Sequence, residues 1–437
     1  MREQKISTQF LGGVQWLLFM FTNTVVIPLS IGSALAMSDG DIAASVQRSF
    51  IYTGIACLMQ ALIGHRLALM EGQSGLWWGV ILGLAASYSP GSYEELGGSL
   101  AVGIILGGVI ITVFGALGMG KLVKKWFSPV VMSVFLFLLA SQLIAIFFKG
   151  MIGLNDHARI QLPTAVLSVV LVVLVVFLMV KGKGKISNFA LLIGIIVGWA
   201  GYRLIFPSHK SMELSSSVSF FDWFPWGSPH WNIGIILTAV LAGLINTTNT
   251  VATLKEAEVF YKRPVVERQY KRSFILTGIN SIVSGLFGLV PYAPYTSSLG
   301  FLYSTRIKER LPFMIGAILF IILGAIPFLG RFFSTLPESV GDAVLFVAYL
   351  QLFGSALKNI NGMTFNFKTI YRIAAPTLVG ISLMNMPASA FLGIPSLVRP
   401  LLSNGLLVGI FLAVILENFI HWEKFVSGDA VKRKESA

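Results

Sequence analysis

Charged residues are scarce in this chain, because Asp, Glu, Lys and Arg make up only 12% of its 437 residues. Soluble domains carry about 25% charged residues, which they need to keep their surface in water. Hydrophobic residues make up 55% of the sequence. A chain of this composition has to place most of its surface in lipid, so we expect an integral membrane protein.

The usual residues of metal and catalytic centres are also scarce. The single cysteine, Cys57, excludes a disulfide framework and a cysteine metal cluster. The five histidines show no metal-ligand spacing, and we find no paired carboxylates or nucleophile motif at the end of an apolar segment. We therefore expect no cofactor, no metal and no enzymatic activity.

Long apolar runs are what the sequence does contain. A helix needs about 20 apolar residues to cross a bilayer. Twelve runs meet this need, and two shorter ones follow stretches rich in Gly, Pro or Ser and are predicted to be half-helices. The long runs are 10–35, 46–64, 97–119, 128–148, 162–180, 187–206, 232–254, 272–289, 311–330, 340–357, 369–385 and 397–420, and the short runs are 75–88 and 297–305. The sequence thus predicts an all-α polytopic membrane protein with fourteen transmembrane segments.

The distribution of basic residues supports this count. With the N-terminus inside, cytoplasmic segments hold 25 of the 32 Lys and Arg residues and outer segments hold 7. Such an excess marks the cytoplasmic side, and omitting either half-helix would invert every later loop. We expect a multi-pass protein of the cell (inner or plasma) membrane with both termini in the cytoplasm. The basic residues behind the net charge of +13 then set the membrane topology and contact anionic lipid head groups. A nucleic-acid partner would need one contiguous basic patch, so we expect none.

The two halves of the chain share a sequence repeat. Thr22-Asn23-Thr24-Val25 recurs as Thr248-Asn249-Thr250-Val251, and the eight residues 48–55 recur at 272–279 with seven identities. Segments 1 and 2 therefore match segments 8 and 9. Each half holds seven segments, an odd number, so the second half enters the membrane from the opposite side. The fold class predicted is a 7+7 inverted repeat.

The third segment of each half, 71–88 and 291–305, is interrupted, and we expect extended backbone at 71–75 and 293–297. Broken helices at matching positions of inverted repeats point to a binding site near the middle of the membrane. Extended backbone there offers amide donors and carbonyl acceptors, and each half-helix directs a positive N-terminal end inward. We expect half-helices entered through extended backbone at segments 3 and 10. A kinked packing helix is the alternative for either break taken alone.

Segment 8 adds a polar run to an apolar helix. At 100° per residue, Asn246, Asn249 and Thr250 share one face. They would reach the binding site, or else bond to the twin run at 22–24, since Asn and Thr commonly join membrane helices. The aromatic residues able to stack on a planar ring are Trp16, Trp77, Trp78 and Tyr295. Their alternative role is anchoring at the membrane interface.

Four stretches resemble the nucleobase/ascorbate transporter family, which includes the bacterial uracil and xanthine permeases. They are Gln15-Trp16-Leu17-Leu18-Phe19-Met20-Phe21 with Val26-Ile27-Pro28; Gly64-His65-Arg66-Leu67 with Glu71-Gly72-Gln73-Ser74-Gly75; Ser284-Gly285-Leu286-Phe287-Gly288 before Pro291; and Ser297-Ser298-Leu299-Gly300 with Thr305-Arg306. The resemblance covers most of the chain and is strongest in segments 1–3 and 8–10.

This resemblance implies a core domain at 1–126 and 231–335 and a gate domain at 127–230 and 336–437, the latter with a cytoplasmic tail. It implies a nucleobase substrate held between short strands at segments 3 and 10, a coupling proton or sodium ion, and a homodimer formed through the gate domain. The substrate contacts that it implies are Gln73, Ser74, Gly75, Asn246, Thr250, Tyr295, Thr296 and Ser297, with Trp16 as a stacking residue.

The sequence departs from the family pattern at three positions. Asn246 stands where a glutamate is usual in segment 8, Ser297-Ser298 replaces Glu/Gln-Asn in segment 10, and Trp16 replaces a histidine of uracil permeases. The usual proton-binding carboxylates are therefore missing. Glu71 is a candidate coupling residue, or else a charge paired with His65 or Arg66.

The function predicted is a permease for a nucleobase, of the xanthine, hypoxanthine or urate type, with proton-coupled uptake by alternating access. Three alternatives remain: facilitated diffusion, an anion transporter on the same scaffold, and a membrane receptor that does not transport. The core segments contain no Lys or Arg within the membrane, which argues against strong anion selectivity.

Overall fold

The computed structural model describes residues 2–88, 90–118, 126–154, 159–182, 185–206 and 222–422, and most of them are helical. Seven helices in the described chain are long and apolar enough to cross a membrane, and an eighth is added if the bent pair Arg310–Ala325 and Pro327–Ser334 counts as one span. Three further helices are apolar but shorter, namely Gly75–Ala85, Ala190–Ile205 and Gly405–Asn418. This agrees with a multi-pass membrane protein, whereas the count of fourteen crossings stays a prediction.

Every apolar run of the sequence has a helix at its position. The elements of the first half are α1 (Arg2–Thr24), α2 (Val26–Ala34), α3 (Asp39–Leu62), β1 (Glu71–Gln73), α4 (Gly75–Ala85), η1 (Pro90–Ser92), α5 (Tyr93–Leu117), α7 (Pro129–Met151), α8 (Leu162–Lys181), α9 (Lys185–Asn188) and α10 (Ala190–Ile205). Those of the second half are α11 (Ile233–Tyr261), α12 (Glu267–Phe287), β2 (Tyr292–Pro294), α13 (Ser297–Thr305), α14 (Arg310–Ala325), α15 (Pro327–Ser334), α16 (Glu338–Asn359), α17 (Phe367–Met384), η2 (Ala388–Phe391), α18 (Arg399–Leu402) and α19 (Gly405–Asn418).

The exact ends of the helices depend on capping side chains and prolines, which a hydropathy pattern does not predict. α3 begins earlier than expected because the Ser38 hydroxyl accepts a hydrogen bond from the Asp41 amide at 3.2 Å. The segment expected as one helix over 311–330 ends at Ala325, and α15 departs from α14 at 85°. Pro327 stands at the break, where it lacks the amide that would continue the helix.

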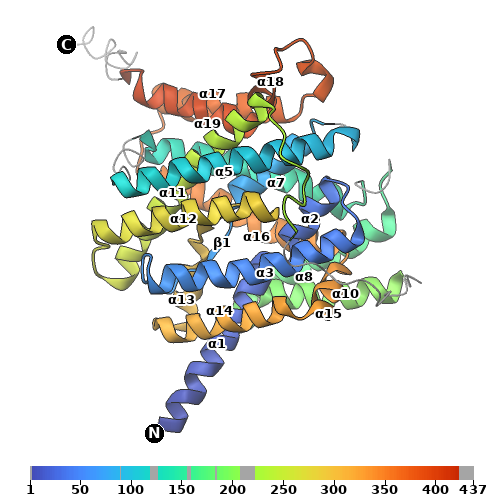
Figure 1. The fold of residues 1–437 in the computed structure, drawn as a ribbon, viewed down its shortest axis with the longest axis vertical. Helices are drawn as coiled ribbons and strands as arrows, with labels where there is room; N and C mark the ends of the chain where they lie inside the picture. Colours follow the sequence, from blue (N-terminus) through green and yellow to red (C-terminus); the bar gives the residue numbers. More distant parts are fainter. Residues whose placement is uncertain are drawn as a thin grey trace, which may run out of the picture.

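The two halves interlock (Figure 1). α5 of the first half packs against α11 and α12 of the second, and α14 of the second half packs against α1 and α3 of the first. The order helix, helix, strand, short helix, helix occurs once in each half. This reciprocal packing is what two inverted repeats would give, although the seven-plus-seven arrangement stays a prediction.

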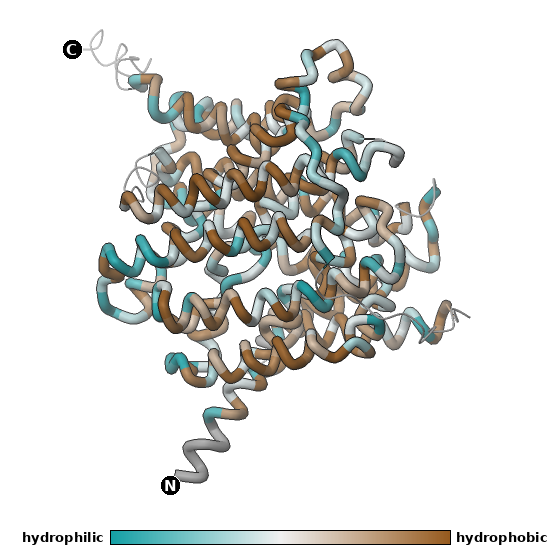
Figure 2. The backbone as a smooth tube through the Cα atoms, in the orientation of Figure 1, coloured by the Kyte–Doolittle hydropathy of each residue, from teal (hydrophilic) through white to brown (hydrophobic). Residues whose placement is uncertain are grey.

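Apolar side chains face outward as well as inward. Figure 2 shows brown, hydrophobic stretches along the helices and teal, hydrophilic residues gathered at helix ends and in the connections. On α8, Val169, Val170, Val173 and Phe177 are each more than half exposed. In water such a surface would promote aggregation, so these faces are suited to lipid.

α5 and α12 approach so closely that main chain meets main chain. A methyl group added at Gly108 would lie 2.7 Å from the carbonyl oxygen of Gly278 and 2.8 Å from the amide nitrogen of Ile282. Real methyl groups essentially never come this close, and neither neighbour is a side chain that can rotate away. Small residues are the usual means of such close packing between membrane helices.

We predict that Gly108→Ala destabilises the fold, because overpacking of this kind costs about 1–3 kcal/mol. The matched control is Gly107→Ala on the same helix, whose new methyl group would lie 3.6 Å from its nearest neighbour, Val240 Cα. The buried thiol of Cys57 reports unfolding through a thiol-reactive fluorescent dye during a thermal ramp. Equal unfolding temperatures for Gly108→Ala and the unaltered protein would contradict the close packing.

Candidate functional site

The two interrupted stretches meet as a small antiparallel sheet at the centre of the molecule. β1 pairs with β2 in the register Glu71 to Pro294, Gly72 to Ala293 and Gln73 to Tyr292. The pairing extends beyond the strands, because the Ser74 amide donates to the Pro291 carbonyl and the Tyr295 amide to the Met70 carbonyl, both at 2.8 Å. The chain is therefore extended at both breaks, as the sequence predicts.

The expectation that this backbone is free needs correction. The two strands hydrogen-bond to each other along their facing edges, and side chains donate hydrogen bonds to carbonyl groups of the two strands. Asn246 donates to the Tyr292 carbonyl at 2.9 Å, Thr253 donates to the Pro294 carbonyl at 3.0 Å, and the Tyr295 hydroxyl donates to the Gln73 carbonyl. Buried main chain needs such partners, so most of it is not available to a ligand.

Asn246 joins three elements. Its amide nitrogen binds β2, while its carbonyl oxygen accepts from Ser74 Oγ at 2.6 Å and from Asn249 Nδ2 at 3.0 Å. The side chain is fully buried. The polar face of α11 thus turns toward the strands, as its periodicity predicts, and does not pair with the run at 22–24. Thr250 lies on the same face, buried, with a hydroxyl that has no hydrogen-bond partner.

The half-helices α4 and α13 begin directly after the strands. Neither Ser74 nor Thr296, the residues at their starts, caps its own helix with its side chain. Ser74 bonds to Asn246 instead, and the Thr296 hydroxyl lies 2.7 Å from that of Thr253. In α13 the amides of Ser298 and Leu299 donate to the carbonyls of Tyr295 and Thr296 at 3.1 and 2.9 Å. Both helices still direct their positive N-terminal ends toward this point, where they favour an electron-rich group. Thr296 and Ser297 are exposed at this point.

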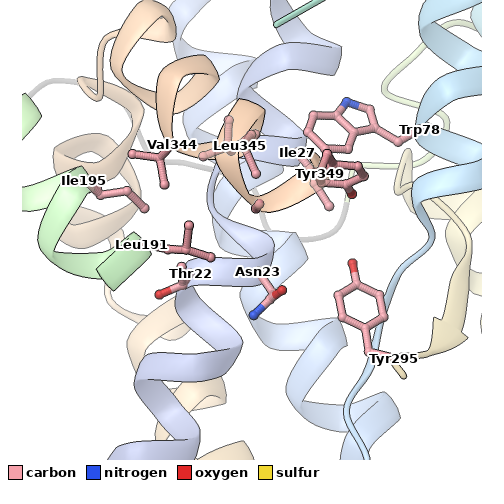
Figure 3. Close-up of a pocket in the computed structure, with 12 residues that line it drawn as sticks. Thr22, Asn23, Ile27, Trp78, Leu191, Ile195, Tyr295, Val344, Leu345 and Tyr349 are labelled. Carbon is pink, nitrogen blue, oxygen red and sulfur yellow. The ribbon is translucent and has the colours of Figure 1, made fainter. Parts of the chain in front are cut away.

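A cavity lies beside the strand pair (Figure 3). It contains about 440 Å³ of empty space, counting the part open to solvent. The lining residues come from the α1–α2 junction, α4, the start of α13, α10 and α16. They are Thr22, Asn23, Val26, Ile27, Trp78, Leu191, Ile195, Tyr295, Val344, Leu345, Ala348 and Tyr349.

Of the residues expected to touch substrate, Tyr295 is the one that lines this cavity. Figure 3 shows its hydroxyl and the Asn23 amide directed into the same space. Gly75 lies at the edge, where an added methyl group would be 3.2 Å from the Tyr349 hydroxyl. Gln73 is buried behind the cavity, with its amide nitrogen 3.1 Å from Ser49 Oγ and its carbonyl oxygen without a partner.

Trp16 lies in an aromatic cluster away from the cavity. Its ring centroid is 4.5 Å from that of Phe301, 4.9 Å from Phe313 and 5.5 Å from Phe19. Trp78, in contrast, does line the cavity, and its indole nitrogen donates to Ser30 Oγ at 2.7 Å. Trp78 is therefore a buried residue in the wall of the cavity, and Trp16 joins α1, α13 and α14.

Glu71 is fully buried next to the strand pair. One of its carboxylate oxygens accepts a hydrogen bond from Thr277 at 2.9 Å, and the other has no partner. In the described part of the chain Glu71 forms no salt bridge with His65 or Arg66, so the alternative of a simple cytoplasmic ion pair is not what the structure shows.

Sequence reasoning did not assign the cavity residues of segments 1, 7 and 12. Thr22 and Asn23 carried a usable signal, because a polar pair interrupts an apolar run and recurs in the repeat. Their side-chain donors bond back to the carbonyls of Leu18 and Phe19 at 2.8 Å. No sequence pattern predicted that Tyr349 and its neighbours on α16 line the cavity, because the sequence of an apolar helix does not show which of its faces meets a cavity.

Comparison with known proteins agrees with this architecture. A model of the xanthine/uracil permeases, described as "Permease family", matches residues 7–389. The protein YwdJ of Bacillus subtilis is 28% identical over 436 residues, which cover 96% of this chain and 98% of YwdJ. The uric acid permease PucJ of the same organism is 26% identical, over 93% of this chain and 91% of its own.

Among solved structures, the transmembrane domain of the cyanobacterial bicarbonate transporter BicA has the same fold, with a TM-score of 0.65 at 16% identity over 93% of this chain and 96% of that one. At this identity the likeness concerns the fold alone. The match of the family model along most of the sequence is decisive: this chain belongs to the xanthine/uracil permease family, whose members are membrane transporters and not enzymes.

Proposed function

We propose that this protein is a permease for a nucleobase, with a purine of the xanthine, hypoxanthine or urate type as its substrate. The observation that carries the proposal is the cavity, where aromatic rings and a primary amide surround a space beside two half-helix ends. A uric acid permease and a xanthine permease are among the relatives of the chain, at 26% and 22% identity.

The chemistry of the lining suits a flat heterocycle. Trp78, Tyr295 and Tyr349 offer ring faces and edges to a planar base, and such aromatic contacts are worth about 0.5–1.5 kcal/mol beyond the area they bury. Asn23 can accept through Oδ1 and donate its second N–H to the edge of the base, since its first N–H goes to Phe19. The Tyr295 hydroxyl can accept, since its proton goes to the Gln73 carbonyl. Among the described residues that line the cavity none is Lys or Arg, so this lining favours a polar, hydrogen-bonding ligand over a strongly charged anion.

The cavity lies between the two domains that the family resemblance implies, core (1–126 and 231–335) and gate (127–230 and 336–437). We propose that α16 and α10 move relative to the strand pair and so expose the cavity to each side of the membrane in turn. Both termini lie in the cytoplasm, and the gate domain forms a homodimer. Proton coupling completes the proposal, and the sequence offers Glu71 as one candidate for the group that binds the proton.

Filling the cavity tests this proposal. We predict that Ala348→Trp abolishes uptake of labelled urate, xanthine, hypoxanthine and uracil into proteoliposomes, because the indole occupies the space meant for the base. Leu350→Trp is the control on the same helix, since that side chain is 42% exposed and outside the cavity. Unchanged uptake by Ala348→Trp would exclude this cavity, and failure of the unaltered protein to transport any of the four bases would exclude the function.

We also predict that Asn246→Ala abolishes uptake while the protein still inserts into the membrane. The substitution leaves the Tyr292 carbonyl and the Ser74 hydroxyl without their partner, at about 1–3 kcal/mol for each buried group. Thermal unfolding should begin at a lower temperature for the same reason.

Thr248→Val is the control for Asn246→Ala. The Thr248 hydroxyl is buried on the same helix and has no hydrogen-bond partner, so its removal should change neither uptake nor stability. Normal uptake by Asn246→Ala would show that α11 is not part of the substrate site.

A further inference from the structure

α16 carries a buried carboxyl group that the cavity and the strand pair do not use. Asp342 lies in the first turns of this helix, and its side chain is 1% exposed. Its Oδ2 atom has no hydrogen-bond partner. Ionisable side chains inside membrane proteins are costly, and each unpaired one calls for a functional explanation.

Asp342 lies at the surface where α16 meets the first half of the chain. Helical residues three and seven apart share a face, so Asp342 shares one with Leu345 and Tyr349. Figure 3 shows both of these residues at the cavity. At the adjacent Gly341, an added methyl group would lie 2.9 Å from Val26 Cγ1 on α2. In the proposed domains, α16 belongs to the gate and α2 to the core.

No cation balances this carboxyl group within the described residues. The elements packed against α16 carry Lys149 on α7, Lys181 on α8, Tyr202 and Arg203 on α10, and no titratable group on α2, while α16 itself adds Glu338, Tyr349 and Lys358. None of the described cations forms a salt bridge with Asp342, and Arg203 donates to Thr335 Oγ1 at 2.9 Å. The charged group that acts on Asp342 is Glu338, which is itself acidic.

A group that carries a proton across the membrane has to change its surroundings during the cycle. Glu71 is enclosed by α3 and α12, where Cys57 contacts its main chain and Thr277 its carboxylate. Both helices belong to the proposed core domain, so domain movement leaves this environment intact. The stretch of α16 around Asp342 contacts α2 of the proposed core, because Gly341 faces Val26 and Glu338, one turn earlier, accepts a hydrogen bond from Ser33 at 3.2 Å. The same movement therefore changes the surroundings of Asp342.

We propose that Asp342 binds the proton coupled to transport, an inference that rests on the proposed permease function. When α16 closes against α2, the carboxylate takes one proton from the solution on that side and is buried as the neutral acid. When the contact opens toward the other side, water reaches the group and the proton leaves into that solution. One proton thus crosses with each substrate molecule, and no other bond is made or broken.

Two assays in proteoliposomes separate coupling from transport. The first measures accumulation of labelled urate, xanthine, hypoxanthine or uracil under an inward proton gradient; a gradient of about one pH unit supports about tenfold accumulation at one proton per substrate. The second measures counterflow exchange of the same base at equal pH. We expect Asp342→Asn to lose the gradient-driven accumulation and to keep counterflow, and Asp342→Glu to recover part of the accumulation.

An exposed carboxyl group away from α16 supplies the control, because Glu309→Gln should accumulate substrate like the unaltered protein. Accumulation by Asp342→Asn at the normal level would overturn the proposal. So would loss of counterflow together with accumulation in that variant, or loss of accumulation in Glu71→Gln alone. If the unaltered protein shows counterflow but does not accumulate substrate under the proton gradient, the proposal of proton coupling is wrong. If it transports none of the four bases, the proposed function is wrong.

Discussion

The structure depends on the need of buried main chain for hydrogen-bond partners. Two stretches near the centre of this membrane protein leave the helical conformation, and lipid offers no donors or acceptors in exchange. β1 and β2 meet this need by pairing with each other, and α11 completes it through Asn246 and Thr253, which bind carbonyl groups of β2. Segments that are distant in the sequence are thereby held together at one point, and the two half-helices start from it.

This arrangement separates a fixed part of the site from a part that can move. The paired strands and the polar face of α11 bond to one another, which is why Gln73, Ser74 and Asn246 are buried and engaged. The cavity lies beside them, and α16 and α10 close it on the opposite wall. In the proposed cycle the strand pair presents the half-helix ends, while α16 determines access to the substrate and to the proton on Asp342.

Much of this could be predicted from the sequence, because the governing signals are local. Apolar length located the helices, Gly, Pro and Ser located the two breaks, and a 100° period placed Asn246 and Thr250 on the face of α11 that meets the strands. The remainder depends on tertiary packing. Contacts with residues distant in the sequence decide which strand carbonyls are hydrogen-bonded and why Trp16 packs among phenylalanines. They also decide which way Asp342 and Tyr349 face, and no local sequence pattern predicts these contacts.

The central claim is that a nucleobase binds in the cavity between the strand pair and α16. A structure determined with a bound purine tests it most directly. The account predicts the base against Trp78, Tyr295 and Tyr349, with a polar edge toward Asn23 and the half-helix ends. A base bound outside this cavity, without contact to α16, would contradict the account.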